Sequence, residues 1–179
     1  MASSRSERQS PPASARLAVA PRRRPAKPRI FPSFPRRGIP DTLLFLTKEI
    51  SCVLLAEPHH ALAEGTRLLL GTLFDAVVMV ADESSLLETA GRVRPGLLMV
   101  DLILAKKNVA GLISRLREIS PGSKVIVVSV HDEPAVARAI LESGADGFLV
   151  KCRIGCELIP AVEAVLRGER YISSSSTRD

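Results

Sequence analysis

Four side chains with the means to do chemistry stand where apolar runs of this sequence end. Each is the polar residue directly after three to five apolar residues: Glu57, Asp101, Ser129 and Lys151. Such runs are typical of buried parallel strands, and the carboxyl ends of these strands form the edge where open α/β sheets place their sites. Two carboxylates, a hydroxyl and an ammonium group gathered there would form one polar site. Asp101 is the most informative, because a buried strand would deliver its carboxylate to that edge.

The elements that must position these side chains alternate along the chain as in βα units. Strands are predicted over 51–56, 76–80, 97–101, 124–130 and 147–150. Helices are predicted over 59–70, 84–93, 109–119, 134–143 and 156–166. Asp82 and Asn108 are placed to cap two helices, and glycines follow the ends of the other three. Five such units in series predict an α/β fold, with a doubly wound, five-stranded parallel sheet between two layers of helices.

The composition is that of a folded, soluble protein. The 179 residues are 46% hydrophobic, enough for a core, and no apolar stretch approaches the roughly 20 residues of a membrane span. Cys52, Cys152 and Cys156 are too few and too irregularly spaced for a disulfide framework, so we expect reduced thiols. A zinc site would need further ligands. His59 and His60 are not expected to bind a metal as a pair, because adjacent residues at a helix start point in different directions.

Basic charge is concentrated at the start of the chain. Residues 1–40 hold ten Lys or Arg residues against one acid and eight of the thirteen prolines, whereas the whole chain carries a net charge of +6. Proline cannot donate a backbone hydrogen bond, so we expect a disordered arm. Its interpretations are a solvated tail, a segment that attracts nucleic acid or anionic lipid, an organelle transit peptide, or residues upstream of the true translation start. The sequence leaves these alternatives open.

Five stretches carry a family resemblance when they are taken together. They are VLLAEPH (53–59), VDL (100–102), VIVVSVHD (125–132), GADGFLVK (144–151) and RGERYIS (167–173). In this order and spacing they resemble the receiver domain of two-component response regulators, most closely receivers of the NarL/FixJ type. The resemblance implies a CheY-like, flavodoxin-like fold. We therefore expect a basic arm, a lead-in segment, a receiver domain and a polar tail over 1–40, 41–50, 51–172 and 173–179.

The resemblance also implies roles for individual residues. Asp101 matches the phospho-acceptor, a carboxylate nucleophile whose reaction calls for a divalent metal, a cation and a hydroxyl that senses the phosphoryl group. Lys151 matches the cation and Ser129 the hydroxyl. Phe148 stands at the position of the aromatic ring that moves with the family's switch. The implied Mg²⁺ ligands are Glu57, Asp101 and the backbone oxygen of Ile103.

The sequence departs from the family at the metal site and in the loop after Asp101. Where the family has two adjacent acids, this chain has Glu57 and Pro58, and proline offers no side-chain oxygen to the near-octahedral oxygen ligation of Mg²⁺. Mg²⁺ binding is therefore expected to be weak or lost. Ala105 and Val109 stand where the family usually has proline and glycine. A β-branched residue resists positive φ, so we expect a remodelled loop.

Two functions follow from the resemblance. The leading hypothesis is a bacterial, cytoplasmic, single-domain response regulator in phosphorelay signal transduction, which accepts a phosphoryl group on Asp101 from a histidine kinase or phosphotransfer protein. It would not be an enzyme beyond catalysing its own phosphoryl transfer and dephosphorylation. Phosphorylation would switch a surface that binds an output partner or a second copy as a homodimer. The alternative is a degenerate, phosphate-independent receiver that acts as a dimerisation or protein-interaction module.

Two further classes are disfavoured. The related receivers lead from the segment matching 168–172 to a helix-turn-helix domain, whereas seven polar residues follow here, so no DNA-binding domain is expected. A flavodoxin-like enzyme or nucleotide binder is disfavoured because no glycine-rich phosphate loop follows the first predicted strand.

Overall fold

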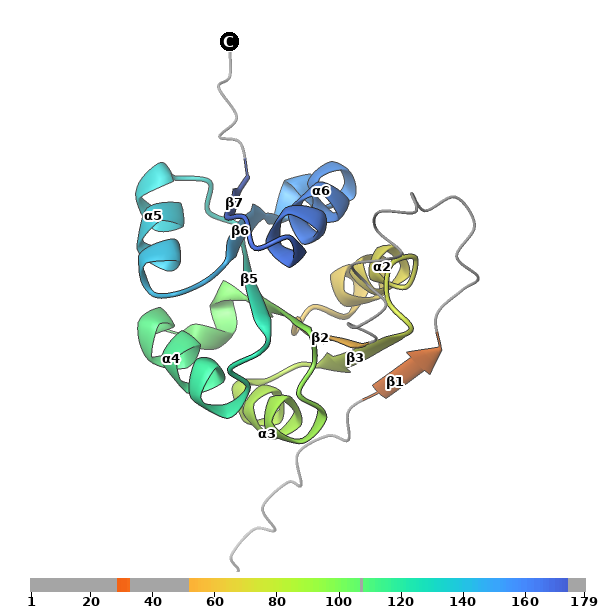
Figure 1. Cartoon of the computed structure of the whole chain (residues 1–179). Coiled ribbons are helices and arrows are strands. Elements are labelled where there is room, and N and C mark those ends of the chain that lie inside the picture. Colours follow the sequence, from red (N-terminus) through yellow and green to blue (C-terminus); the bar gives the residue numbers. More distant parts are fainter. Residues whose placement is uncertain (1–28, 33–51, 107, 174–179) are drawn as a thin grey trace, which may run out of the picture.

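The computed structural model describes residues 29–32, 52–106 and 108–173. The lead-in segment 41–50, most of the arm and tail residues 174–179 lie outside the described residues. The strands form one sheet in the order β1-β3-β2-β4-β5-β6-β7, and helices cover both of its faces (Figure 1). From β3 to β7 neighbouring strands are parallel, whereas β1 pairs with β3 in antiparallel fashion. The strands are β1 (Arg29–Pro32), β2 (Cys52–Ala56), β3 (Ala76–Val80), β4 (Leu97–Asp101), β5 (Lys124–Ser129), β6 (Gly147–Val150) and β7 (Tyr171–Ile172).

Helices α3 and α4 begin at residues whose side chains cap them. Asp82 accepts a hydrogen bond from the backbone N–H of Ser85, and Asn108 accepts one from Gly111, so both predicted caps are confirmed. No helix in the described part of the chain combines the length and apolar character that a membrane crossing needs. The helices are α2 (His60–Leu70), α3 (Glu83–Val93), α4 (Val109–Ile119), α5 (Pro134–Glu142) and α6 (Ile154–Leu166), with short 3₁₀ helices η1 (Leu102–Ala105) and η2 (Lys151–Arg153).

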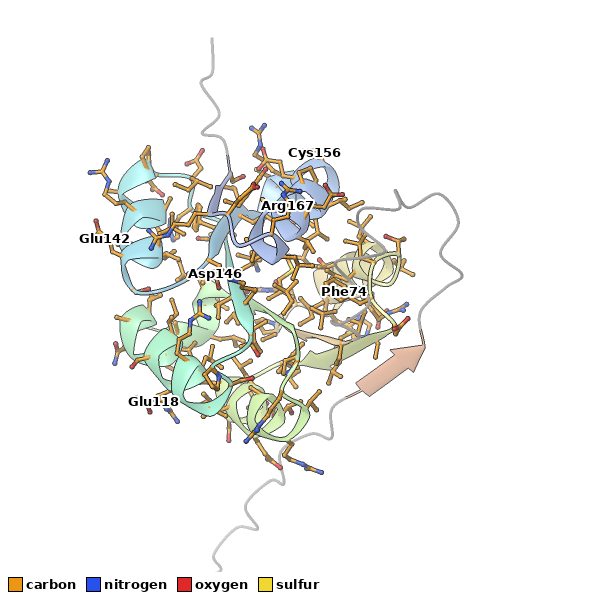
Figure 2. The ribbon with its side chains drawn as sticks, viewed as in Figure 1. Phe74, Glu118, Glu142, Asp146, Cys156 and Arg167 are labelled. Atoms are coloured by element: carbon orange, nitrogen blue, oxygen red, sulfur yellow. The ribbon has the colours of Figure 1, made fainter. Side chains whose placement is uncertain are left out.

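Two apolar cores lie on opposite faces of the sheet. Helices α3, α4 and α5 pack on one face, and α2 and α6 pack on the other (Figure 1). All five residues of β4 are buried, which explains why its sequence is continuously apolar up to Asp101. Phe74 is buried in the α2–α6 core, whereas Glu118 and Glu142 lie on the outer faces of α4 and α5 (Figure 2).

The five parallel strands predicted from the apolar runs are present, and the sheet is longer than predicted by one short strand at each edge. Arg29–Pro32 was expected to be disordered, but it forms β1 against the outer edge of β3. Tyr171–Ile172 forms β7 against β6. Both strands are too short to show a periodic pattern, and each is formed by hydrogen bonds to an open sheet edge. The last helix begins at Ile154 rather than 156, because it continues directly from the 3₁₀ helix η2.

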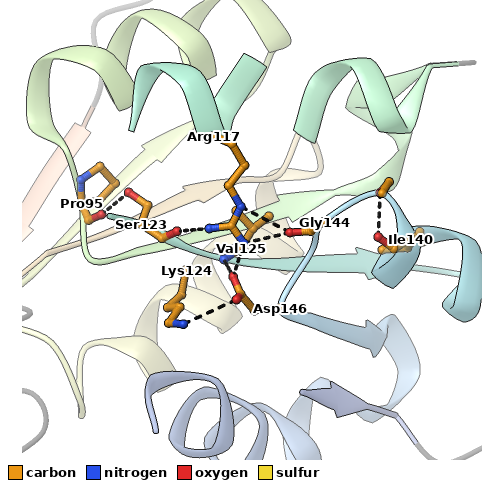
Figure 3. Close-up of polar contacts among 9 residues, drawn as sticks. Pro95, Arg117, Ser123, Lys124, Val125, Ile140, Gly144 and Asp146 are labelled. Carbon is orange, nitrogen blue, oxygen red and sulfur yellow. Dashed lines mark hydrogen bonds and ion pairs between the residues drawn. The ribbon is translucent and has the colours of Figure 1, made fainter. Parts of the chain in front are cut away.

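The amino-terminal edge of the sheet is fastened by Asp146 (Figure 3). Its carboxylate accepts hydrogen bonds from the backbone N–H of Val125 at 2.7 Å and from the guanidinium of Arg117 at 2.6 Å, and it lies 3.6 Å from the Lys124 ammonium. Arg117 also donates to the Gly144 carbonyl at 2.8 Å. These contacts join α4, β5 and the loop before β6. Asp146 is therefore a turn acid at the edge opposite the predicted site.

Replacing Asp146 by Asn should lower the free energy of unfolding by about 2 kcal/mol, because charge-assisted hydrogen bonds to Arg117 and Val125 are weakened. Urea unfolding of the full chain measures this loss. Asp132→Asn, which changes an exposed acid, serves as the matched control and should stay within about 0.5 kcal/mol of the unchanged protein. Equal unfolding midpoints for the two variants would show that the Asp146 contacts contribute nothing net.

Candidate functional site

The four predicted polar side chains lie at the carboxyl edge of four neighbouring strands. Strands β2, β4, β5 and β6 end at or directly before Glu57, Asp101, Ser129 and Lys151. A cavity of about 320 Å³ opens over this edge. Its lining consists of His59, Asp101, Leu102, Ile103, Lys106, Ser129, Val130, His131 and Lys151. The parallel arrangement of the strands therefore gathers residues that are far apart in the sequence.

Lys151 bridges the two acidic side chains. Its ammonium Nζ lies 2.7 Å from Oδ2 of Asp101 and 2.8 Å from Oε2 of Glu57. Both carboxylate side chains are only 4% exposed, and the Lys151 side chain is 12% exposed. Two buried carboxylates at one edge would repel each other, so the ammonium is what makes their ionised forms compatible. Three of the predicted site residues thus form one ionic cluster.

The contacts of this cluster shift the ionisation of its members. Burial would raise the pKa of Glu57, but hydrogen bonds from the Lys151 ammonium and from the backbone and ring of His59 outweigh burial and hold that pKa below its usual range. Burial would lower the pKa of Lys151, but hydrogen bonds to Asp101 and Glu57 and their negative charges raise it overall. Both shifts favour the charged forms of Glu57 and Lys151.

His59 belongs to this site, although sequence reasoning left it out. Its ring Nδ1 lies 2.7 Å from Oε1 of Glu57 and 3.9 Å from Oδ2 of Asp101, and its backbone N–H donates to the same Glu57 oxygen at 2.9 Å. The side chain is 62% exposed, so the ring stands between the carboxylates and solvent. Its position two residues after Glu57, at the start of α2, was the available sequence signal.

The other two predicted residues differ in their access to the cavity. Ser129 is buried but lines the cavity, and its hydroxyl oxygen accepts a hydrogen bond from the backbone N–H of His131 at 2.9 Å. Phe148 is buried in the core beneath α3, α4 and α5 and does not line the cavity. Val130 is exposed at the cavity lining. The cavity therefore offers a hydroxyl group, whereas the aromatic ring lies behind the site.

The loop after Asp101 has a strained backbone. Oδ1 of Asp101 accepts a hydrogen bond from the N–H of Ile103, and the Ile103 carbonyl accepts one from Lys106 at 3.2 Å. Lys106 has φ 51° and ψ −111°, a conformation that favours glycine. Val109, where strain was considered, begins α4 instead. The positive φ therefore falls on a residue that lines the cavity, and sequence reasoning missed it.

The donor atoms do not match the all-oxygen ligation that Mg²⁺ prefers. Glu57 and Asp101 supply carboxylate oxygens, but Pro58 supplies none, and the Ile103 carbonyl is already engaged by Lys106. The third potential ligand within 4.8 Å is the ring nitrogen of His59. Weak Mg²⁺ binding stays a prediction, and the ring nitrogen of His59 is the additional donor at this edge.

A larger cavity of about 510 Å³ lies between α3, η1 and α4 and shares Ile103 and Lys106 with the first. Three of its charged groups, Asp82, Glu83 and Arg115, are engaged with their neighbours. Arg115 pairs with Glu83 at 2.9 Å, and Asp82 caps α3. The reactive groups therefore face the smaller cavity.

The response regulator receiver domain matches residues 53–163 of the chain. The chain belongs to this family. The flavodoxin-like, CheY-like fold expected from the sequence is thereby confirmed for this receiver.

Bacterial regulators are among the relatives of this receiver. The methanol utilization control regulatory protein MoxX of Paracoccus denitrificans is 33% identical over 125 residues, which cover 68% of this chain and 56% of MoxX. The transcriptional regulatory protein DegU of Brevibacillus brevis is 27% identical over 129 residues, with coverage of 71% and 55%. The receiver domain of the response regulator NarL from Mycobacterium tuberculosis matches with a TM-score of 0.58 and 25% identity, covering 67% of this chain and 98% of that domain. The chain spans about half the length of MoxX and DegU.

Replacing Lys151 by Met should lower the free energy of unfolding by about 3 kcal/mol at neutral pH, because it leaves two buried carboxylates without their cation. The pH dependence should also change sign. In the unchanged protein the contribution of Glu57 is present above its ordinary pKa of 4.5 and is lost as the pH falls through its lower folded-state pKa. In the variant, burial raises the pKa of Glu57 without the opposing Lys151 ammonium, so stability should rise on acidification.

Urea unfolding over an acidic pH series measures both effects. Lys124→Met removes the ammonium of the partly exposed pair with Asp146 and should cost no more than about 1 kcal/mol. A Lys151→Met protein that keeps both the stability and the pH profile of the unchanged chain would contradict the role given to the ammonium.

Replacing Lys106 by Gly should raise the free energy of unfolding by about 1 kcal/mol, because glycine accepts the positive φ without strain. Differential scanning calorimetry measures the change. Lys106→Ala removes the same charge but keeps a Cβ atom, so it should give no such gain. Equal melting temperatures for the glycine and alanine variants would rule out backbone strain at this position.

Proposed function

We propose that this receiver accepts a phosphoryl group on Asp101 from a phosphohistidine of a histidine kinase or phosphotransfer protein. An oxygen of the Asp101 carboxylate attacks phosphorus, the N–P bond of the phosphohistidine breaks, and the leaving imidazole keeps the electron pair and takes up a proton. The product is an aspartyl phosphate, whose later hydrolysis returns Asp101. Such a protein is a signalling module in a phosphorelay, and its own phosphoryl transfer and dephosphorylation are the only chemistry assigned to it.

The observation that carries the proposal is the Lys151–Asp101 contact of 2.7 Å at the floor of an open cavity. An ammonium group held there can pair with phosphoryl oxygens as they arrive at the carboxylate. The Ser129 hydroxyl lines the same cavity and is positioned to donate to a phosphoryl oxygen. Phe148 is buried in β6, two residues before the end of that strand. It would carry the change to the surface of α5, β6 and α6.

The proposal also includes the bounds of the domain, its partner and its cellular location. The receiver occupies 51–172, and the switched surface binds an output protein or a second copy of the chain. A cytoplasmic location agrees with the three free cysteines Cys52, Cys152 and Cys156.

Incubation of the full chain with a small phosphodonor should add the mass of one phosphoryl group to the unchanged protein. Peptide mapping should place that group on Asp101. Parallel reactions contain Mg²⁺ or Co²⁺, so that the result does not depend on one choice of cation. Beryllofluoride, which mimics the bound phosphoryl group, should change the oligomeric state or the amide spectrum of the same protein.

Asp101→Asn should abolish the mass gain, because the amide is not a carboxylate nucleophile. Asp132→Asn, an exposed acid three residues beyond Ser129, is the matched control and should be phosphorylated normally. An unchanged mass and spectrum in every reaction would overturn phosphoryl acceptance and favour the phosphate-independent interaction module.

A further inference from the structure

The replaced acid of the metal site has a structural substitute. Pro58 occupies the second acidic position, but the next residue brings a ring nitrogen to the carboxylates: Nδ1 of His59 lies 2.7 Å from Oε1 of Glu57 and 3.9 Å from Oδ2 of Asp101. One ligand atom from each of these three residues lies within 4.8 Å of the other two. Among the described residues, this is the group of His, Cys, Asp and Glu side chains that could hold an ion.

We propose that Glu57, His59 and Asp101 bind a divalent first-row transition cation in preference to Mg²⁺. The inference deepens the proposed phosphoryl-accepting function, on which its biological purpose rests, by naming the class of cation at that site. Metal binding itself is measurable without phosphoryl transfer. It also assigns a ligand role to His59.

The chemistry of the donor set supports this class of cation. An imidazole nitrogen is a good ligand for Co²⁺, Ni²⁺ and Zn²⁺, whereas Mg²⁺ favours six oxygens and keeps much of its water. In the ion-free site the ring Nδ1 faces Glu57 as a hydrogen-bond donor, so ion binding moves the ring proton to Nε2 and frees Nδ1 as a ligand. Two carboxylates and one imidazole leave further coordination positions for water or a phosphoryl oxygen. The lost carboxylate therefore changes the selectivity of the site rather than abolishing ion binding.

The spacing of the His59 and Glu57 ligand atoms suits a shared ion, whereas Oδ2 of Asp101, at 3.9 Å from the ring, would have to move closer. Neighbouring ligand atoms on an octahedral ion with bonds near 2.1 Å are about 3 Å apart, close to the 2.7 Å between Nδ1 of His59 and Oε1 of Glu57. Lys151 holds the other Glu57 oxygen, Oε2, so it does not occupy the side of the carboxylate that faces the ring. The ion and the ammonium would share Oδ2 of Asp101.

The backbone fixes the ring in place. His59 is the cap residue of α2 with φ −87° and ψ 104°, its carbonyl accepts from Ala63, and its N–H donates to Glu57. Pro58 restricts the chain directly before it. The ring is nevertheless largely exposed, so an ion can reach it from solvent.

The test is calorimetric titration of the metal-stripped full chain with Co²⁺ and with Mg²⁺. The unchanged protein should bind Co²⁺ at least about tenfold more tightly than Mg²⁺. His59→Gln should lose at least about tenfold of the Co²⁺ affinity and keep its Mg²⁺ affinity. His60→Gln removes the adjacent exposed imidazole and should bind both ions like the unchanged protein. Pro58→Asp, which restores a carboxylate, should raise Mg²⁺ affinity.

A second readout needs no substitution. Bound Co²⁺ is paramagnetic and should shift the ring resonances of His59 much more strongly than those of His60. Its absorption spectrum should be that of imidazole and carboxylate ligation. Equal affinities for Co²⁺ and Mg²⁺, an unaffected His59→Gln protein, or a thiolate spectrum from Cys152 and Cys156 would each overturn the proposal.

The phosphodonor reactions separate this proposal from the function on which it rests. Co²⁺ binding that depends on His59, together with no phosphoryl group on Asp101, would retain the ion site and overturn the proposed function. Phosphorylation of Asp101 that proceeds with Mg²⁺ and is unchanged in His59→Gln, together with equal affinities for the two ions, would retain the function and overturn the ion proposal.

Discussion

The arrangement of this site depends on one ammonium group between two buried carboxylates. Glu57, Asp101 and Lys151 come from the ends of β2, β4 and β6, so their contacts tie together strands that are separate along the chain. The carboxylates have little access to water, and Lys151 supplies the positive charge that contacts both. Any ligand at this edge must therefore change how Lys151 pairs with the two carboxylates. An anion competes with the carboxylates for Lys151, and a cation competes with Lys151 for the carboxylates.

This balance is linked to the last strand of the sheet through β6. Lys151 directly follows β6, and Phe148 lies within it. The Phe148 carbonyl accepts a hydrogen bond from the N–H of Ser173, directly after β7, and the Ser173 hydroxyl donates to the buried carboxylate of Glu157 on α6. The position of β6 therefore sets that of β7. The residues that hold the ionic cluster and those that hold the carboxyl-terminal strand share one short segment.

The two edges of the sheet differ in how their side chains are bound: one is closely hydrogen-bonded, and the other borders an open cavity. At the amino-terminal edge, Asp146 and Arg117 satisfy backbone groups and join α4 to β5 and β6. At the carboxyl-terminal edge, the strained Lys106 and the largely exposed ring of His59 surround an open cavity. A strained residue can persist at a site only where the contacts around it hold the fold in place without its help.

Much of the fold, and the polar residues that end the strands at the site, could be predicted from local sequence. A run such as 97–100 is apolar throughout because helices cover both faces of its strand, and the polar residue that follows must then lie at a sheet edge. Caps such as Asp82 are equally local, because their partners lie within one helical turn. The edge strands β1 and β7 escaped prediction, since two to four residues show no period and their hydrogen bonds depend on which edge is open.

The sequence by itself determined the alternation of strands and helices and the chemical types at the carboxyl edge, because both follow from residues close together in the chain. Only the tertiary structure decided that Lys151 contacts both acids, that the ring of His59 turns toward them, and that positive φ falls on Lys106. Contacts of this kind depend on how the strands are ordered and how the loops cross the sheet. Segments remote in sequence meet there, and no local pattern records the distance between them.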